Sequence, residues 1–477
     1  MEQITNQQNT ETVFPGDPRV RVLLGKQTPP EQGQTIRPCH FALHRYIDGR
    51  YLLFHTLTRR AVLLPPALIQ HFVPGKTFSP EVLADETLAK LYEDFFLVPS
   101  DCDEATLYQD IKDILRLKEE LPDGIGNYVI LPTTVCNARC FYCFEQGIRY
   151  RKMSPETLEH TVRYILDHLP ESKKLHISWF GGEPLMAADN IDQISRRLKD
   201  EGVEFQSDMI SNGSRFNDEI IERAVSLWNL KEVQITLDGL EEEYCRRKRY
   251  LPSVQNPFPT VIANVHRLLA KDIAVKLRLN LDADNIGELF RCVDYIAEEF
   301  SEEAERKKLL VYSHALFGCA GCGIDHDVEP YVDQLNDYIG RKGLGGGAKT
   351  PELFQLKTTY CMADRAEHAA VIDAEGRLYT CEAMPENLIY GDVKNGITDE
   401  GKYERITTTG DIPAECRTCA YLPECTDFLL CPNREELPKC REHMGRRMDR
   451  AIHGMYFAYQ EHLRKKAEEK EEPDVQH

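Results

Sequence analysis

The chain has 477 residues, a formal net charge of −20 and 42% hydrophobic residues. This length suits about two or three domains, and this composition excludes a largely disordered chain. The acidic balance argues against non-specific nucleic-acid binding, which needs a basic surface. No apolar run is long enough to cross a membrane, and residues 1–14 lack the basic and apolar regions of a secretory signal. We therefore expect a cytoplasmic protein without a membrane or nucleic-acid partner.

The first 120 residues show strand patterns followed by helix patterns. Residues 37–75 predict strands, and the pair Asp48–Gly49 between two strand-like runs predicts a hairpin turn. Apolar spacing over 79–98 and 103–121 predicts helices. We expect a small α+β domain over residues 1–120.

From residue 127, strand-like and helical runs alternate. The strand-like runs are 127–134, 174–182, 205–213, 231–239, 274–282 and 309–318. Between the first two, Ser154 followed by Pro155 predicts the start of a helix. This alternation predicts a parallel α/β architecture, closed or partly closed as a barrel, over residues 121–330. In such folds the chemistry takes place at the carboxyl ends of the strands.

Residues 341–352 are rich in glycine and predict a linker or flexible loop. Beyond them, residues 361–440 are rich in cysteine and poor in regular pattern, which is typical of a domain held together by metal. The chain has 16 cysteines, and in a reducing compartment clustered cysteines indicate metal or iron–sulfur ligands rather than disulfides. We expect this domain over residues 331–455, with a charged tail over 456–477.

Three cysteines follow the first strand of the alternating region: Cys136, Cys140 and Cys143, spaced as CxxxCxxC. Iron–sulfur clusters are usually held by four thiolates, so three ligands would leave one iron open for an exogenous ligand. A structural zinc site would need a fourth ligand, and no histidine lies nearby in the sequence. Three buried structural cysteines are the alternative.

This motif, placed after the first strand of an alternating α/β region, resembles the radical S-adenosylmethionine (radical SAM) superfamily. The resemblance implies a partial (β/α)6 radical SAM barrel and a [4Fe–4S] cluster whose open iron chelates SAM. It also implies that the reduced cluster cleaves SAM to methionine and a 5′-deoxyadenosyl radical, which abstracts a hydrogen atom. The cofactor carries this chemistry and the protein positions it.

Motifs at the other strand ends carry the same resemblance. GGEP at 181–184 matches the family motif whose backbone and glutamate contact the SAM amino group, and glycines allow such a close approach. A tight turn is the alternative. SNG at 211–213 and LDG at 237–239 resemble the family's TNG and SLDG motifs. The SAM contacts implied in these motifs are Gly181, Gly182, Glu183 and Asn212.

Five further SAM contacts are implied by position. Tyr142 would stack on the adenine, and Leu316 would lie near it unless it is plain core. The hydroxyl of Thr236 would touch SAM, and Asn280 would meet the ribose. Arg247 would bind the SAM carboxylate, although most of the basic run around it is expected to be a solvated face.

The cysteines near the C-terminus carry a second resemblance, to the SPASM domain, whose pattern is CX9–15GX4C followed by CX2CX5CX3C and a last cysteine. Here the gap between Cys425 and Cys431 has five residues in place of three. The resemblance implies two auxiliary [4Fe–4S] clusters, and therefore three clusters in all. The ligands implied by the resemblance are Cys361, Cys381 and Cys431 for the first auxiliary cluster, and Cys416, Cys419, Cys425 and Cys440 for the second.

Seven cysteines cannot fully ligate two cubane clusters, which need eight ligands. The eighth is Cys319 or Cys322, or a substrate thiolate on an open iron. A zinc ribbon is the alternative for the second group. Glu382 directly follows Cys381, where related sulfatase maturases carry an acid that deprotonates the substrate. It is a candidate general base or an ordinary exposed glutamate.

Radical SAM enzymes with SPASM domains mainly modify peptides and proteins. The resemblance therefore implies a maturase of ribosomally made peptides that forms a thioether crosslink of the sactipeptide or ranthipeptide type. The alternatives are a carbon–carbon crosslink, an anaerobic sulfatase maturase that forms formylglycine, and a non-enzymatic iron–sulfur or zinc scaffold. The implied partners are a precursor peptide and an external electron donor such as flavodoxin or ferredoxin. Residues 1–120 resemble the winged-helix-like module that binds a leader peptide by strand addition, or form a generic N-terminal lobe.

Overall fold

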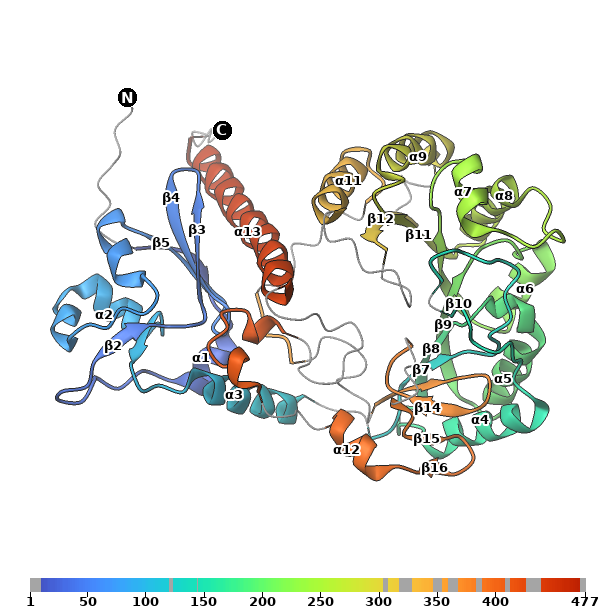
Figure 1. The fold of residues 1–477 in the computed structure, drawn as a ribbon, viewed down its shortest axis with the longest axis horizontal. Helices are drawn as coiled ribbons and strands as arrows, with labels where there is room; N and C mark the ends of the chain where they lie inside the picture. The colour runs from blue at the N-terminus through green and yellow to red at the C-terminus, as the bar shows by residue number, and fades with distance from the viewer. Residues whose placement is uncertain are drawn as a thin grey trace, which may run out of the picture. The chain divides into compact units, whose positions relative to one another are not determined.

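The structure is a computed structural model, which describes residues 10–119, 123–143, 145–302, 308–316, 328–345, 354–358, 368–382, 388–407, 412–425 and 439–471. The chain divides into two compact units (Figure 1). The first contains residues 1–120, 349–361 and 409–477, and the second contains residues 121–348 and 362–408. The first unit is therefore built from both ends of the chain.

The second unit is built on a ten-stranded sheet with the order β12-β11-β10-β9-β8-β7-β13-β14-β15-β16 (Figure 1). Six strands are parallel neighbours in chain order: β7 (Asn127–Ile130), β8 (Lys174–Trp179), β9 (Glu204–Ser211), β10 (Leu230–Thr236), β11 (Ala274–Leu281) and β12 (Leu309–Ala315). The helices that follow these strands are α4 (Pro155–Asp167), α5 (Ala188–Asp200), α6 (Asp218–Ser226), α7 (Glu241–Lys248), α8 (Pro257–Ala270), α9 (Ile286–Glu299) and α11 (Glu329–Arg341). The predicted parallel α/β fold is confirmed.

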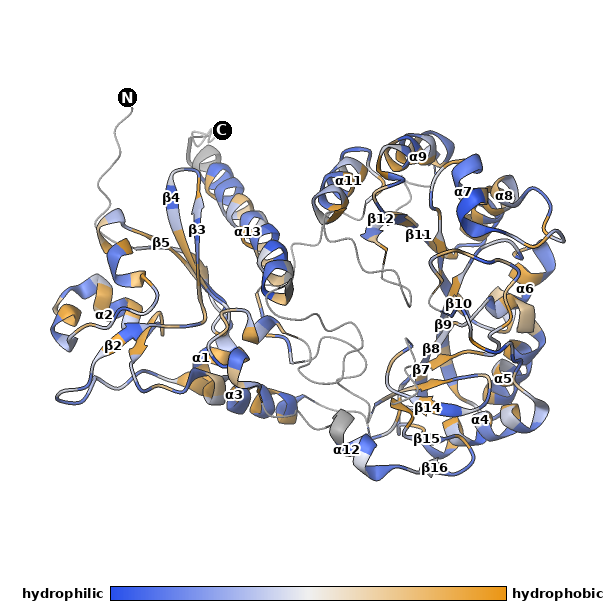
Figure 2. Cartoon of the chain, viewed as in Figure 1, coloured by the Kyte–Doolittle hydropathy of each residue, from blue (hydrophilic) through white to orange (hydrophobic). Residues whose placement is uncertain are grey.

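The predicted start of α4 is also confirmed. The Ser154 hydroxyl accepts a hydrogen bond from the Thr157 N–H at 3.1 Å, and Pro155 occupies the first helical position. Hydrophobic and hydrophilic residues alternate around the helices of this unit, as α9 shows in Figure 2. This amphipathic pattern lets each helix bury one side against the sheet.

The parallel strands have one apolar and one polar face. In β11, Val275, Leu277 and Leu279 are fully buried, whereas Lys276 and Arg278 between them are half-buried. Because successive side chains of a strand point to opposite faces, this alternation separates a packed core from a polar surface. The carboxyl ends of the strands meet at one edge of the sheet, where the predicted site residues collect.

Short strands extend the sheet beyond β7. β13 (Ala369–Ile372) is parallel to β7, and β14 (Arg377–Tyr379), β15 (Gly391–Asp392) and β16 (Gly396–Ile397) continue antiparallel. Helix α12 (Glu400–Thr407) follows. These strands are too short to show an alternating pattern, which is why the sequence predicted little regular structure here.

The first unit has a four-stranded antiparallel sheet with the order β1-β5-β4-β3. Its strands are β1 (Glu11–Pro15), β3 (Ala42–Ile47), β4 (Arg50–His55) and β5 (Arg60–Leu64), and β2 (Ile36–Pro38) pairs separately with β6 (Leu97–Pro99). Its helices are α1 (Pro18–Leu24), α2 (Glu86–Glu93), α3 (Glu104–Lys118) and α13 (Lys439–Glu471). The predicted hairpin is confirmed, because Asp48 and Gly49 have φ values of 49° and 75° and connect β3 to β4.

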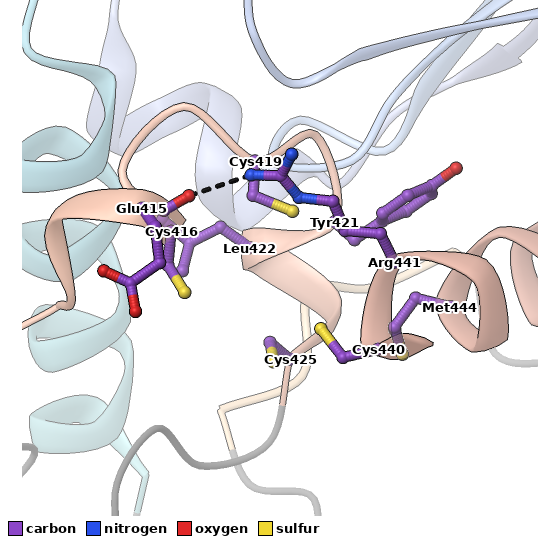
Figure 3. Close-up of a pocket in the computed structure, with 9 residues that line it drawn as sticks. All are labelled: Glu415, Cys416, Cys419, Tyr421, Leu422, Cys425, Cys440, Arg441 and Met444. Carbon is purple, nitrogen blue, oxygen red and sulfur yellow. Dashed lines mark hydrogen bonds between the residues drawn. The ribbon is translucent and has the colours of Figure 1, made fainter. Parts of the chain in front are cut away.

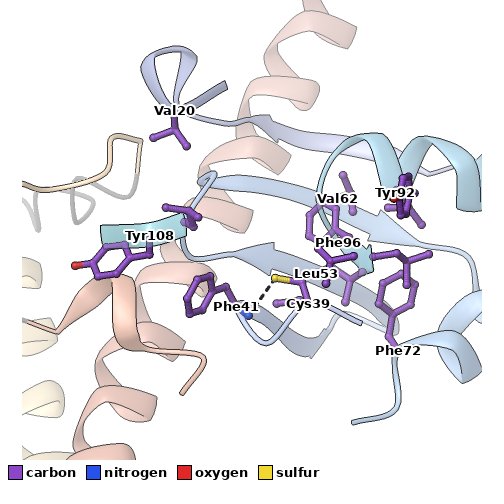
Figure 4. Close-up of a cluster of buried hydrophobic side chains, with 14 of the residues drawn as sticks. Val20, Cys39, Phe41, Leu53, Val62, Phe72, Tyr92, Phe96 and Tyr108 are labelled. Atoms are coloured by element: carbon purple, nitrogen blue, oxygen red, sulfur yellow. Dashed lines mark hydrogen bonds between the residues drawn. The ribbon is translucent and has the colours of Figure 1, made fainter. Parts of the chain in front are cut away.

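Both faces of this sheet are covered. On one face, Leu53 joins a core with Phe41 and Tyr108 (Figure 4). On the other, Leu52 packs in a cluster with Ile452 of α13. This helix is one continuous element that extends through most of the predicted tail. No helix in the described part of the chain is long and apolar enough to cross a membrane.

Candidate functional site

The loop between β7 and α4 carries Cys136, Cys140 and Cys143. Each thiol is half-buried, and none of the three forms a disulfide. The Thr134 N–H donates a hydrogen bond to the carbonyl of Arg151 at 2.9 Å, which ties the start of the loop to the segment that leaves it. The loop is thereby held at the carboxyl end of β7.

Two glycines let the end of β8 approach this loop. Gly181 has a φ of 112°, and a Cβ atom there would lie 2.4 Å from the Thr133 carbonyl oxygen. At Gly182, a Cβ atom would lie 2.7 Å from the carbonyl oxygens of Thr134 and Val135. The Gly182 N–H donates to the Thr133 carbonyl at 3.1 Å. This contact between two backbones leaves no room for a side chain.

Glu183 is fully buried and connects the ends of β8 and β9. Its carboxylate accepts hydrogen bonds from the Asn212 N–H at 2.8 Å, the Ser211 hydroxyl at 2.9 Å and the Leu185 N–H at 3.2 Å. Burial raises the pKa of Glu183 above its ordinary value, and these hydrogen bonds oppose that rise. The Glu183 carboxylate therefore holds the ends of β8 and β9 together. Its contact with the SAM amino group stays a prediction.

Asn212 connects the end of β9 to the cysteine loop. Its Nδ2 donates to Asn137 Oδ1 at 2.8 Å and lies 3.9 Å from Cys136 Sγ. Its Oδ1 accepts from the Ser214 hydroxyl at 2.7 Å, which fixes the orientation of the amide. An amide donor therefore lies beside one of the three thiols, where hydrogen bonds tune a thiolate-bound metal group.

Two residues that received no role from the sequence, Asp238 and Lys248, lie beside Tyr142. The Tyr142 hydroxyl donates to Asp238 and accepts from Lys248 Nζ at 2.8 Å, and this nitrogen lies 3.3 Å from Asp238. Both are buried. Burial opposes the charge of Lys248, but the facing carboxylate raises its pKa overall. Burial and Asp238 also raise the pKa of Tyr142, so its hydroxyl stays a donor. The sequence signal that could have identified Lys248 is its position, ten residues after the aspartate of the LDG motif.

Arg247, which the resemblance implied for the SAM carboxylate, has other partners. Its two terminal nitrogens donate to Asp282 at 2.7 and 2.8 Å, and its Nε donates to Glu243. The guanidinium is fully buried and lies 5.3 Å from the centre of the Phe141 ring. Of these two neighbouring cations, Lys248 is the one hydrogen-bonded to a residue of the cysteine motif.

The remaining predicted SAM contacts lie at the carboxyl ends of neighbouring strands. Thr236 is the last residue of β10 and is half-buried. Asn280 lies in β11 and is 6% exposed. Leu316 directly follows β12, and its N–H donates to the Leu281 carbonyl at 2.9 Å. The structure therefore brings the strand-end residues to the edge that carries the cysteine loop.

A second group of cysteines lines one pocket in the first unit (Figure 3). The pocket is lined by Glu415, Cys416, Cys419, Tyr421, Leu422, Cys425, Cys440, Arg441 and Met444. In the described ranges, no three His, Cys, Asp or Glu side chains lie close enough together to hold a single metal ion. The four thiols are instead spread around the pocket, and four thiolates are the donor set of a [4Fe–4S] cluster and also of a structural zinc site.

A buried ion pair braces this pocket. Glu424 directly precedes Cys425 and pairs with Arg59, whose side chain is 1% exposed. The Thr56 hydroxyl donates to the Ala420 carbonyl at 2.8 Å. The turn after β4 therefore supports the chain between the second and third cysteines.

The structure describes only some of the other predicted cluster ligands. Cys319, Cys322, Cys361 and Cys431 lie outside the described residues. Cys381 is half-buried, and Glu382 is exposed directly after it. The first auxiliary cluster, its eighth ligand and the role of Glu382 stay predictions.

The profile of the Radical SAM superfamily matches residues 130–281, the stretch that contains the cysteine loop and the strand-end motifs. The chain contains a radical SAM domain. Two probable GTP 3′,8-cyclases are similar to this region: that of Thermococcus kodakarensis is 27% identical over 178 residues, and that of Pyrococcus horikoshii is 29% identical over 173 residues. These matches cover 36% and 35% of this chain and 54% and 52% of the relatives. The chain thus spans about half the length of the curated relatives it matches.

The matches to solved structures cover a larger part of the chain than the match to the Radical SAM profile. The structure described as native anSMEcpe with bound AdoMet and Cp18Cys peptide has a TM-score of 0.55 and 14% identity, and the match covers 71% of this chain and 99% of that one. Native anSMEcpe with bound AdoMet has a TM-score of 0.54 and 14% identity, with 70% and 99% covered. At this identity the likeness establishes a shared radical SAM fold.

Proposed function

We propose that this protein is a radical SAM enzyme that modifies a peptide. One observation carries the proposal: the loop with Cys136, Cys140 and Cys143 lies at the carboxyl end of the first strand of a radical SAM domain, and the next strand ends surround it. When bound there, a [4Fe–4S] cluster and SAM supply reductive cleavage of SAM and hydrogen abstraction.

The chain's own residues bind and orient in this proposal. The three thiolates hold the cluster, and Asn212 directs an amide donor at Cys136. The charge of Lys248 is balanced by Asp238, which lies 3.3 Å from its Nζ, and this buried pair holds the side chain of Tyr142 in place. The Glu183 carboxylate keeps the ends of β8 and β9 together, so the ligand would meet a preorganised site.

The proposed substrate is a ribosomally made precursor peptide, and the proposed product is a thioether between a cysteine sulfur and a carbon. Two observations support a peptide substrate. The fold resembles that of a protein whose structure contains both AdoMet and a peptide. The pocket lined by Cys416, Cys419, Cys425 and Cys440 suits an auxiliary cluster, which would accept an electron as the product is oxidised.

The decisive experiment is anaerobic reconstitution followed by addition of reductant and SAM. We expect 5′-deoxyadenosine to form with the native chain, and none with Cys136, Cys140 and Cys143 all changed to alanine. A Cys425→Ala variant should keep some SAM cleavage but give no modified peptide. If the triple variant still cleaved SAM, the SAM-binding cluster would lie elsewhere. If the native protein with intact clusters did not cleave SAM, the proposal that it is an enzyme would be refuted.

The product separates the alternatives. With the peptide encoded beside this gene, a thioether would lower the peptide mass by two hydrogens and remove an alkylatable thiol. Loss of two hydrogens with the thiol retained would indicate a carbon–carbon crosslink. Conversion of a single cysteine or serine to an aldehyde would indicate a sulfatase maturase.

A further inference from the structure

Four basic side chains lie around the cysteine loop, although the whole chain carries a net charge of −20. Arg139, Arg149, Lys152 and Arg249 are all exposed there. No carboxylate in the described part of the chain forms an ion pair with any of these four side chains. We call these four residues the basic patch.

The basic patch follows the cysteine loop on both sides. Arg139 lies within the loop, and its N–H donates to the carbonyls of Lys248 and Arg249 at 3.0 and 3.1 Å. On the other side, Lys152 pairs with Thr133 in an isolated antiparallel bridge. Three separate segments therefore bring their positive charges to one neighbourhood.

Apolar side chains lie among these charges. Ile148 is 37% exposed and Tyr150 is 53% exposed. The Arg139 guanidinium lies 4.8 Å from the centre of the Tyr150 ring and also donates to the Cys136 carbonyl at 2.7 Å. Exposed aromatic and aliphatic side chains among arginines are typical of a protein interface.

We propose that the basic patch docks an acidic electron-carrier protein, an inference that rests on the proposed function. SAM cleavage needs one electron, which the reduced carrier loses and the cluster held by Cys136, Cys140 and Cys143 gains. The net charge of the chain repels an acidic carrier whereas the basic patch attracts it, so opposite charges favour docking beside the cluster. An acidic precursor peptide is the competing occupant, and the experiment separates the two.

The test compares Arg149→Glu/Lys152→Glu with Arg196→Glu/Lys231→Glu. The control makes the same charge change at exposed residues in the second half of α5 and at the start of β10, away from the cysteine loop. Reduction of the reconstituted cluster is followed anaerobically by its absorbance, with reduced flavodoxin or with dithionite. Equilibrium binding of oxidised flavodoxin is measured in parallel at low and high salt.

We expect the patch variant to lose about tenfold or more in both the flavodoxin rate and flavodoxin affinity at low salt, because steering between opposite charges is lost. Added salt should narrow this difference. The control, and both variants with dithionite, should stay within about twofold of the native protein. Unchanged flavodoxin binding overturns the inference, and so does an equal loss with dithionite, which would mean that the patch supports the loop.

The peptide alternative has its own signature. A raised KM for the precursor peptide with dithionite as reductant, together with normal flavodoxin binding, would assign the patch to the substrate and overturn the inference. Failure of the native protein to cleave SAM with dithionite would refute the proposed function, whereas flavodoxin binding would still report on the docking surface by itself.

Discussion

Gly182 lies where the end of β8 meets the cysteine loop, and the backbone oxygens around it leave no space for a methyl group. Arg247 and Lys248 show a second effect at the residue scale. They are neighbours in the chain, yet Arg247 is held by Asp282 and Lys248 contacts Tyr142. Residue type and spacing do not predict these contacts, because each buried cation pairs with a carboxylate from another segment, Arg247 with Asp282 and Lys248 with Asp238.

Gly182→Ala should destabilise the protein by about 1–3 kcal/mol, because the added methyl group forces two backbones apart. We expect the iron bound at the cysteine loop to fall as well. The measurements are iron content after reconstitution and chemical denaturation. Gly287→Ala, a helical position with no atom within 4 Å of the added Cβ, is the control and should be neutral or stabilising. An unaltered iron content in Gly182→Ala would contradict the proposed close approach.

His55 in the first unit should make stability depend on pH. Its Nδ1 accepts from the N–H groups of Leu57 and Thr58 at 3.2 and 3.3 Å, so Nε2 carries the proton and lies 3.2 Å from the Phe95 carbonyl. Burial lowers the pKa of His55 to about 4. In the unfolded chain the pKa is about 6.5, so between these values the unfolded state binds more protons and the free energy of unfolding falls as pH falls.

We therefore expect the free energy of unfolding of the native protein to fall more steeply from pH 6.5 to pH 5 than that of His55→Gln. The difference is at most about 1.4 kcal/mol per pH unit, the value of one proton. Denaturant titrations at several pH values measure it. Parallel slopes for the two proteins would show that folding does not lower the pKa of His55.

At the scale of elements, the pocket lined by Cys416, Cys419, Cys425 and Cys440, here called the four-cysteine pocket, depends on the N-terminal sheet. Residues 412–425 contribute Leu422 to the core that contains Phe41 and Tyr108. Cys416 and Cys425 pack against the same core. The Arg59–Glu424 pair lies between the turn after β4 and the third cysteine of the pocket. The sheet therefore acts as a template for the pocket.

Arg59→Met should leave Glu424 buried without its partner and cost about 3–5 kcal/mol. We expect this variant to lose the iron of the four-cysteine pocket while it retains SAM cleavage, because the cysteine loop belongs to the other unit. Iron content and 5′-deoxyadenosine formation are the two measurements. Arg59→Met/Glu424→Gln, which removes both charges, should be more stable than the single variant, and equal stability would argue against the ion pair.

At the scale of the whole molecule, the two units have separate cores. The sheet of the second unit is complete within residues 127–397, whereas that of the first unit needs helix α13. Ile452 of this helix is fully buried, since it packs in one cluster with Leu52 and Leu63 of the N-terminal sheet. Disruption of one unit should leave the other folded.

Ile452→Asp should unfold the first unit, because it places a charge in an apolar cluster. Limited proteolysis should then cut within residues 10–119 while the parallel sheet of residues 127–315 stays protected. Phe457→Asp, at a position that is 55% exposed on the same helix, is the control and should resist cleavage like the native protein. Cleavage spread evenly through both units would show that they do not fold independently.

The sequence predicted the parallel sheet, the Asp48–Gly49 hairpin and the position of the cysteine loop, because each leaves a local pattern. Local patterns could not predict that residues 412–425 and α13 pack with residues 10–119. The partners Arg59 and Glu424 are 365 residues apart, and nothing in the residues around either one records the other. The contacts of Lys248 were missed for the same reason, since Asp238 and Tyr142 reach it from separate segments.

The two-ended construction of the first unit also sets an order during synthesis. Ile452 follows Leu63, its neighbour in the apolar cluster, by 389 positions. A ribosome adding about 5–20 residues per second needs roughly 20–80 s to bridge that interval. During this time the strands of the second unit emerge in order and can pair, while the outer face of the N-terminal sheet stays uncovered. The part of the chain that is made first is thus completed last, and until then its uncovered apolar face is exposed to association with other chains.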